Sequence, residues 1–184
     1  MIENERRRIL TIGHSTKTID EFIRLLQAHG IDLLVDVRTI PRSRHNPQFE
    51  AEALAKSLAH AGIDYLHMKE LGGLRKSRRD PVNAGWRNES FRGYADYMQT
   101  PEFAAAIEKL IDLAAAKRLA IMCAEAVPWR CHRSLIADAL VVRGVCVEHI
   151  MSGTKRDAHR LTSFAKRTGL RITYPADEGQ RQLL

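Results

Sequence analysis

Two kinds of side chain in this sequence can move protons or attack a substrate, and each follows a short apolar run. His14 comes after one run, and Glu125 comes after another. A histidine and a carboxylate brought together in a desolvated place can have pKa values near neutrality and act as general acid and base. Cys123 ends the run before Glu125, where a helix start and a nearby arginine can lower the pKa of a thiol. The candidate catalytic residues are therefore His14, Glu125 and Cys123.

A second set of residues suits the binding of a phosphate group. Residues 131–134, Cys-His-Arg-Ser, occupy a predicted strand-to-helix turn. The backbone N–H groups of a helix start bind anions there, and the fork-shaped guanidinium of arginine matches phosphate. Further arginines follow another apolar run and should converge on the same place. The candidate substrate-binding residues are Ser15, Arg38, Arg42, Arg44, Cys131, His132, Arg133 and Ser134.

Several of these residues also have a purely structural interpretation. Arg133 can pair with a local carboxylate such as Asp36 or Glu125 and only brace the loop. His14 can bond a loop carbonyl. Cys123 can be a small apolar side chain in a buried strand, which is the usual role of a thiol in that position.

A metal site is a further interpretation of the thiols. It would combine Cys123, Cys131 and His132 with either His14 or Glu125. Zinc sites normally show recognisable spacings, and neither C-x-x-C nor H-E-x-x-H occurs in this sequence. The sequence therefore predicts no metal, and it carries no recognised fingerprint of another cofactor.

The elements that must position these residues alternate between short apolar runs and helical patterns. Near-continuous apolar strands between helices are typical of an α/β fold with a mainly parallel, helix-covered sheet. We expect an open three-layer α/β/α arrangement with five or six strands. The predicted strands are Ile9–Ile12, Leu33–Val37, Ile63–His67, Leu119–Cys123 and Val145–Ile150, followed by a short apolar piece at Leu170–Tyr174.

Helix signals lie between the strands. Thr18 with Glu21 forms a capping box, and Thr100-Pro101 is an N-cap followed by a first helical residue. Helical patterns also occur over 51–62, 91–98 and 131–143, and a last amphipathic segment surrounds Phe164. In such folds the ligand site lies beyond the carboxyl ends of the strands. The polar segments all follow strands, so the sequence predicts that they share one edge of the sheet.

Nothing in the sequence marks a domain boundary, and we expect a single α/β domain over residues 1–184. Two basic regions stand out within it: a long loop insertion over 68–93, with a net charge of +4, and a C-terminal segment over 155–184. The whole chain carries a formal charge of +7. This excess indicates an anionic ligand such as phosphate, a nucleotide or nucleic acid.

The long loop also suits single-stranded nucleic acid, because basic residues that contact phosphates alternate there with aromatic rings that can stack on bases. An alternative is a solvated loop whose aromatic side chains anchor it to the core. The candidate nucleic-acid-binding residues are Arg75, Lys76, Arg78, Arg79 and Trp86.

The expected compartment is the cytoplasm. The chain has three cysteines, too few for a disulfide framework, and its basic N-terminal residues lead into no apolar stretch of signal-peptide length. No segment approaches the roughly 20 apolar residues of a membrane span. We therefore expect no membrane contact, and the sequence does not indicate an oligomeric state.

Five motifs together resemble one known family. They are TIGHS at 11–15, DVRTIPRSR at 36–44, ELGG at 70–73, CAE with CHRS at 123–125 and 131–134, and GLRITYP at 169–175. In this order they are similar to domain-of-unknown-function family 488. The resemblance implies a single-domain α/β protein and implies no reaction.

Two functions follow as hypotheses. The first is an enzyme that binds a phosphate-bearing substrate, a nucleotide or nucleic acid, at the carboxyl edge of the sheet. In it Arg38, Arg42 and Arg133 bind phosphate, while His14 and Glu125 handle protons. The alternative is a non-catalytic module whose basic loop and C-terminal segment hold nucleic acid.

Overall fold

The computed structural model describes residues 8–78 and 81–176. Its centre is a six-stranded sheet with the order β3-β2-β4-β1-β5-β6. The first five strands in the chain run parallel, and β6 joins the edge antiparallel to β5. The strands are β1 (Arg8–Gly13), β2 (Leu33–Asp36), β3 (Asp64–His67), β4 (Leu119–Cys123), β5 (Cys146–Ile150) and β6 (Arg156–Ala158).

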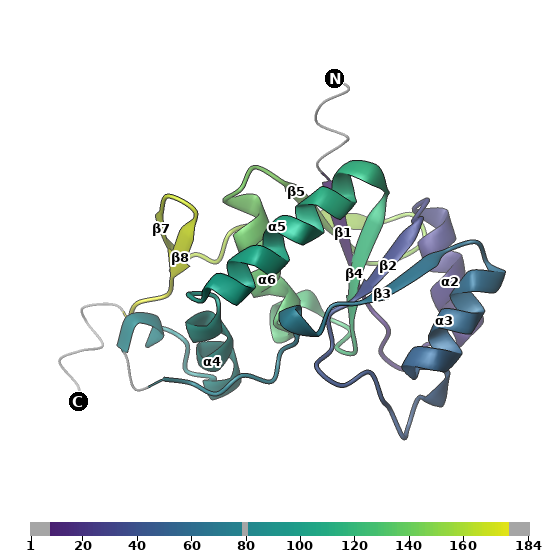
Figure 1. The fold of residues 1–184 in the computed structure, drawn as a ribbon, viewed down its shortest axis with the longest axis horizontal. Coiled ribbons are helices and arrows are strands. Elements are labelled where there is room, and N and C mark those ends of the chain that lie inside the picture. Colours follow the sequence, from purple (N-terminus) through teal and green to yellow (C-terminus); the bar gives the residue numbers. More distant parts are fainter. Residues whose placement is uncertain (1–7, 79–80, 177–184) are drawn as a thin grey trace.

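Helices cover both faces of this sheet, which confirms the predicted three-layer α/β/α fold. Two helices lie on one face and three on the other (Figure 1). The first group is α2 (Ile19–Ala28) and α3 (Ala51–His60), and the second is α4 (Glu89–Tyr97), α5 (Pro101–Ala116) and α6 (Arg133–Val141). No helix among the described residues has the length and apolar character needed to cross a bilayer.

Two apolar cores arise because successive strand residues point to opposite faces. In β4, Leu119 and Ile121 belong to the core under α4, α5 and α6, whereas Ala120 and Met122 belong to the core under α2 and α3. All four residues are buried. A strand covered on both faces needs an unbroken apolar run, which is why this strand was the clearest in the sequence.

The chain reverses its winding direction at the centre of the sheet. β1 and β2 are followed by α2 and α3 on one face, whereas β4, which lies between β1 and β2, is followed by α6 on the other face. The loops after neighbouring strands therefore diverge on both sides of β4. Such a switch point leaves a crevice beyond the carboxyl ends of the strands.

Local signals place the helices that flank this crevice. The Thr18 hydroxyl accepts from the backbone N–H of Glu21, and the Glu21 carboxylate accepts from the backbone N–H of Thr18, so the predicted capping box begins α2. The Thr100 hydroxyl caps α5, with Pro101 in its first turn. α6 begins at Arg133, two residues later than its apolar pattern suggested, because Cys131 has an extended backbone with φ −134°.

The expected amphipathic helix around Phe164 is wrong. This region is irregular and leads into a separate hairpin of β7 (Lys166–Thr168) and β8 (Arg171–Thr173), which turns at Gly169 with φ +60°. Phe164 lies against Trp86, and Tyr174 is fully buried. A few apolar residues anchor this segment to the core, and their chance helical spacing does not make a helix.

The long basic segment over 68–93 is also more ordered than a plain loop. It contains two short 3-10 helices, η2 (Lys69–Leu71) and η3 (Pro81–Asn83), and the first turn of α4. Two further 3-10 helices, η1 (Pro47–Phe49) and η4 (Pro128–Arg130), follow β2 and β4.

Candidate functional site

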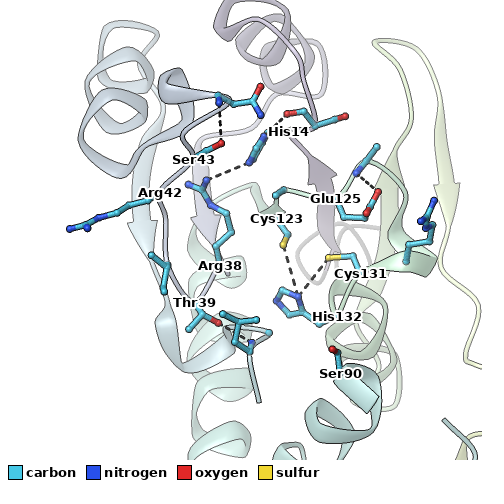
Figure 2. Close-up of a pocket in the computed structure, with 18 of the residues that line it drawn as sticks. His14, Arg38, Thr39, Arg42, Ser43, Ser90, Cys123, Glu125, Cys131 and His132 are labelled. Carbon is cyan, nitrogen blue, oxygen red and sulfur yellow. Dashed lines mark hydrogen bonds between the residues drawn. The ribbon is translucent and has the colours of Figure 1, made fainter. Parts of the chain in front are cut away.

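A cavity of about 640 Å³ opens at the carboxyl ends of the central strands. We call it the carboxyl-edge cavity. Its walls come from the residues after β1, β2 and β4 and from the loop after β3, as the switch point of the sheet requires (Figure 2). Its volume falls within the roughly 300–1,000 Å³ of small-molecule sites. The polar side chains that line it are His14, Ser15, Thr16, Arg38, Thr39, Arg42, Ser43, Asn46, Ser90, Cys123, Glu125, Arg130, Cys131 and His132.

His14 lies directly after β1 and is almost fully buried. Its Nδ1 is 2.8 Å from the carbonyl oxygen of Ser15, and its ring stacks on Phe49 at 4.2 Å between centroids. With Nδ1 donating to that carbonyl, Nε2 carries the lone pair that faces the cavity. Burial lowers the pKa of His14 to about 4, so the ring is neutral at pH 7. The expected movement of this pKa toward neutrality does not occur.

Arg38 is the guanidinium that points toward His14 across the cavity (Figure 2). Its Nε and Nη2 donate to the buried carboxylate of Asp36, and Nη2 also donates to the carbonyl of Phe49 at 2.7 Å. The Tyr65 hydroxyl donates to the same carboxylate at 2.8 Å. Nη1 makes a long contact of 3.4 Å with Nε2 of His14. Arg38 is thus rigidly braced, with its Nη1 edge toward the cavity.

Arg133 takes a different position from the one expected. It is buried behind the cavity wall, where Nη2 donates to the backbone carbonyl of Glu125 at 2.5 Å and Nη1 to the Thr11 hydroxyl at 3.4 Å. Its Nε donates to the Cys131 sulfur at 3.5 Å. It has no carboxylate partner among the described residues, so the suggested ion pair with Asp36 or Glu125 is not formed.

Cys123, Cys131 and His132 meet at the floor of the cavity, and we call them the sulfur–imidazole cluster. Nδ1 of His132 lies 4.0 Å from the Cys123 sulfur and 3.7 Å from the Cys131 sulfur (Figure 2). Nε2 of His132 is 2.9 Å from the carbonyl oxygen of Val37 and donates to it. The Nδ1 lone pair therefore faces both sulfurs.

The two thiols of this cluster do not ionise alike. The pKa of Cys131 lies below the usual thiol range, chiefly because the Cys123 thiol hydrogen-bonds to it, with further help from the guanidinium of Arg133. The same hydrogen bond, together with burial, raises the pKa of Cys123. Thiolate character therefore belongs to Cys131 and not to Cys123, the candidate nucleophile from the sequence.

Three charged side chains lie at the rim of the cavity. Arg42 and Arg130 are exposed, and the Arg42 side chain points away from the cluster in Figure 2. Glu125 is partly exposed, and its carboxylate accepts from the backbone N–H of Ala126 at 3.0 Å. The described residues that line the cavity include three arginines, Arg38, Arg42 and Arg130, and one carboxylate, Glu125, so the charged side chains of the lining carry a net positive charge.

The cavity brings most, but not all, of the sequence-predicted site residues together. Arg44 is exposed and does not line it, and Ser134 is buried, with its hydroxyl donating to the Cys131 carbonyl at 2.9 Å. Arg133 does not line the cavity, and its side chain contacts Cys131, Thr11 and the carbonyl of Glu125. The predicted residues that do line the cavity are His14, Ser15, Arg38, Arg42, Cys123, Glu125, Cys131 and His132.

Of the candidate nucleic-acid-binding residues that the structure describes, none lines this cavity. Arg75 donates to three carbonyls of its own loop and stacks on Tyr97 at 3.6 Å, and Trp86 packs among Phe91, Phe164 and Tyr174. Both contacts anchor the loop. Lys76 and Arg78 are exposed, and Arg79 lies outside the described residues.

Several residues at the site were not anticipated from the sequence. Thr39, Ser43 and Ser90 add hydroxyl groups to the lining, and Phe49 and Tyr65 fix His14 and Asp36. Thr39 and Ser43 lie within the segment after β2, so listing every polar residue beyond a strand end would have found them. Ser90 and Phe49 carry no local signal, because they reach the site only through the packing of α4 and η1.

Comparison with known families identifies a matching family and indicates no reaction. A family model described as Domain of unknown function DUF488 matches residues 18–140, which is more than half of the chain. The matched region includes the sulfur–imidazole cluster and Arg38, whereas His14 precedes it. No curated protein and no solved structure matches the chain.

Proposed function

The chain belongs to the family described as Domain of unknown function DUF488, and from the geometry of its carboxyl-edge cavity we propose that it is an enzyme acting on a phosphate-bearing substrate. The observation that carries this proposal is the composition of one concave site. Arginines stand at its rim and wall, while a neutral histidine, a thiolate-prone cysteine and a second imidazole lie at its floor. Binding alone would not require such groups at the bottom of a cavity.

The arginines divide the work of holding the phosphate. Arg38 is held by Asp36 and offers Nη1 from the wall, so it gives a fixed donor at little cost in side-chain entropy. Arg42 and Arg130 are exposed and can turn inward over a bound anion. Hydroxyls of Ser15 and Thr39 lie among them as neutral donors.

The proton-handling groups stand beside this phosphate site. Because Nδ1 of His14 is committed to the Ser15 carbonyl, Nε2 is the acceptor, and a proton of the substrate or of a water molecule replaces its long 3.4 Å contact with Nη1 of Arg38. Glu125 approaches from the loop after β4. The volume of the cavity suits one nucleotide or the terminal nucleotide of a strand.

A nucleic-acid-binding module without catalysis finds less support. Base stacking by the long basic loop would need exposed rings there, and Tyr94 is fully buried while Trp86 packs between Phe91 and Phe164. The exposed ring of Trp129 lies outside that loop. The basic side chains of this loop that remain exposed can still add phosphate contacts around the cavity.

Calorimetric titration of the full chain with a nucleoside monophosphate and with the matching nucleoside tests the proposal. We expect the phosphorylated ligand to bind more tightly and inorganic phosphate to compete with it. Arg42→Ala or Arg130→Ala should weaken its binding about tenfold, the effect of losing one charge-assisted hydrogen bond of roughly 1.4 kcal/mol.

Arg44→Ala is the matched control, since Arg44 is exposed on the same loop as Arg42 and does not line the cavity. Its affinity should equal that of the unmodified chain. Equal affinity for the two ligands, or equal losses in Arg42→Ala and Arg44→Ala, would contradict a phosphate site in the cavity.

A further inference from the structure

We propose that Cys123, Cys131 and His132 form a binding site for one Zn²⁺ ion, with the fourth coordination position open to the carboxyl-edge cavity. The three ligand atoms all lie within 4.8 Å of one another. Binding of the ion does not depend on the substrate proposed above, so either inference can fail alone.

The distances already approach those of a zinc site. Zinc–sulfur bonds of about 2.3 Å and zinc–nitrogen bonds of about 2.0–2.1 Å at tetrahedral angles place sulfur and nitrogen about 3.6 Å apart. The corresponding distances here are 3.7 Å from Cys131 and 4.0 Å from Cys123 to His132 Nδ1. A contraction of a few tenths of an ångström at most would bring both sulfur–nitrogen distances to this value.

His132 is held in the form that a metal requires. Its Nε2–H donates to the carbonyl oxygen of Val37 at 2.9 Å, so the lone pair is on Nδ1 and points at both sulfurs. Metal-bound histidines commonly donate their other ring N–H to a carbonyl or a carboxylate, which fixes the tautomer and the ring orientation. The neighbouring strand β2 supplies that partner through the residue that follows its end.

Two further residues fit the site to an ion. Nε of Arg133 donates to the Cys131 sulfur at 3.5 Å, and a hydrogen bond of this kind stabilises a metal-bound thiolate. Gly73 packs closely against the imidazole of His132, because a Cβ there would lie 2.5 Å from Nδ1 and 2.9 Å from both Cγ and Cε1. The absence of a side chain at Gly73 thus lets its backbone hold the ring in place.

The chemical type of the three ligand atoms, two sulfurs and one imidazole nitrogen, favours zinc over Mg²⁺ and Ca²⁺. Two thiolates and one imidazole are soft to borderline donors, whereas Mg²⁺ and Ca²⁺ take oxygen ligands. Zinc accepts this set in tetrahedral geometry, and three protein ligands with an open position are the pattern of catalytic zinc. The sequence analysis named these three residues as an alternative metal set, but their spacing gave it no support, because the loop after β4 brings Cys131 back to Cys123 without a standard motif.

Metal titration of the chelator-treated full chain tests the site. We expect one Zn²⁺ per chain, measured by competition with a chromophoric chelator. Co²⁺ in its place should give a sulfur-to-cobalt charge-transfer band and the visible bands of tetrahedral cobalt. Cys123→Ser, Cys131→Ser and His132→Gln should each weaken binding by at least about 100-fold.

Cys146→Ser is the control, because Cys146 lies in β5 outside the cluster and should leave zinc affinity unchanged. If the cluster variants do not fold, the cobalt spectrum of the unmodified chain still decides the question. A chain that binds no stoichiometric metal, or whose cobalt complex has no charge-transfer band, would overturn the proposal. So would cluster variants that bind zinc as tightly as Cys146→Ser.

Discussion

The chemistry of single residues in this protein depends on which of their polar atoms are already engaged. Nε and Nη2 of Arg38 donate to Asp36, and Nη1 is directed toward the cavity. Arg133 is fully buried and is shared between a hydroxyl, a carbonyl and a sulfur. Two arginines that look alike in sequence therefore have separate tasks, one facing the ligand and one behind the thiol. By donating to Thr11 in β1 and to the carbonyl of Glu125, Arg133 holds the loop after β4 against β1.

Gly13 controls that close approach. A Cβ at this position would lie 2.0 Å from the carbonyl oxygen of Glu125 and 2.9 Å from Nη2 of Arg133. Gly13→Ala should therefore force the loop away and lower the free energy of unfolding by about 1–3 kcal/mol, the range for overpacking a closed site. Urea unfolding measures the loss.

Gly153→Ala is the matched control for this substitution. A Cβ at Gly153 meets its nearest neighbour at 3.9 Å, an ordinary contact. Its stability should change by no more than about 0.5 kcal/mol. Equal stability of the two variants would mean that the loop after β4 does not need its close contact with β1.

At the scale of elements, strand order and loop anchoring build the site. β4 lies between β1 and β2, so the loops after all three strands border the same crevice. The segment after β3 reaches the cavity and is fastened to α4. Asp96 on that helix accepts from the backbone N–H of Arg78 at 2.7 Å and from the side-chain amide of Asn83 at 2.8 Å. The Asn83 amide oxygen in turn accepts from the backbone N–H of Tyr174.

Asp96→Ala should release this fastening. Asp96 is buried, and its removal leaves the backbone N–H of Arg78 and the amide of Asn83 without their acceptor, which costs roughly 2–3 kcal/mol. Limited trypsin digestion should then cut the basic segment at least about tenfold faster. Asp112→Ala, at an exposed position on α5, should leave the cutting rate unchanged. Equal rates in both variants would show that the segment is held by other contacts.

Sequence alone predicted the elements well where the signal is local. The Thr18–Glu21 capping box and the apolar run of β4 each depend on neighbours within a few residues. β7 lies in the region mistaken for a helix, whereas β8 falls inside the short apolar piece expected at Leu170–Tyr174. The burial of Tyr174 depends on contacts distant in sequence, so the hairpin as a whole was not predicted. The edge that carries the site could be predicted, since parallel strands all place their carboxyl ends there.

The details of the site were less predictable for the same reason. The meeting of Cys123 with His132 depends on the path of a loop, and the burial of Arg133 depends on acceptors supplied by Thr11 and Glu125. None of these pairings has a characteristic spacing. The residues predicted at the strand ends therefore included most of those that line the cavity. The separate positions of Arg38 and Arg133 could not be predicted in this way.

At the scale of the whole molecule, a chain of hydrogen bonds links the site to Asp138 on α6. Thr11 lies 2.7 Å from Nδ1 of His149, and Nε2 of His149 lies 3.0 Å from Nδ1 of His159. Nε2 of His159 is 2.8 Å from the carboxylate of Asp138. The Asp138 carboxylate accepts from Nε2 of His159, which anchors this end of the chain of hydrogen bonds. Arg133 donates to Thr11 at the other end.

This chain predicts a loss of stability in acid. Burial, His159 and Arg133 lower the pKa of His149 to about 4, with Asp157 opposing them. Between pH 6.5 and about pH 4, His149 is mostly protonated in the unfolded chain and mostly neutral in the folded chain. Stability should therefore fall as pH falls through this window, by at most about 1.4 kcal/mol per pH unit from this residue.

Urea unfolding of His149→Gln between pH 7 and pH 5 measures this contribution. The variant should be less stable at pH 7, because it loses ordered hydrogen bonds, and its stability should depend less on pH. His60→Gln, at an exposed position on α3, should follow the unmodified chain. A His149→Gln profile parallel to that of the unmodified chain would contradict the lowered pKa.

The most direct test of the central claim is a crystal structure of the chain grown with a nucleoside monophosphate. The phosphate should lie in the carboxyl-edge cavity against Nη1 of Arg38, with Arg42 or Arg130 turned inward over it. A phosphate bound instead along the basic 155–171 segment, with the cavity free of ligand, would contradict the account.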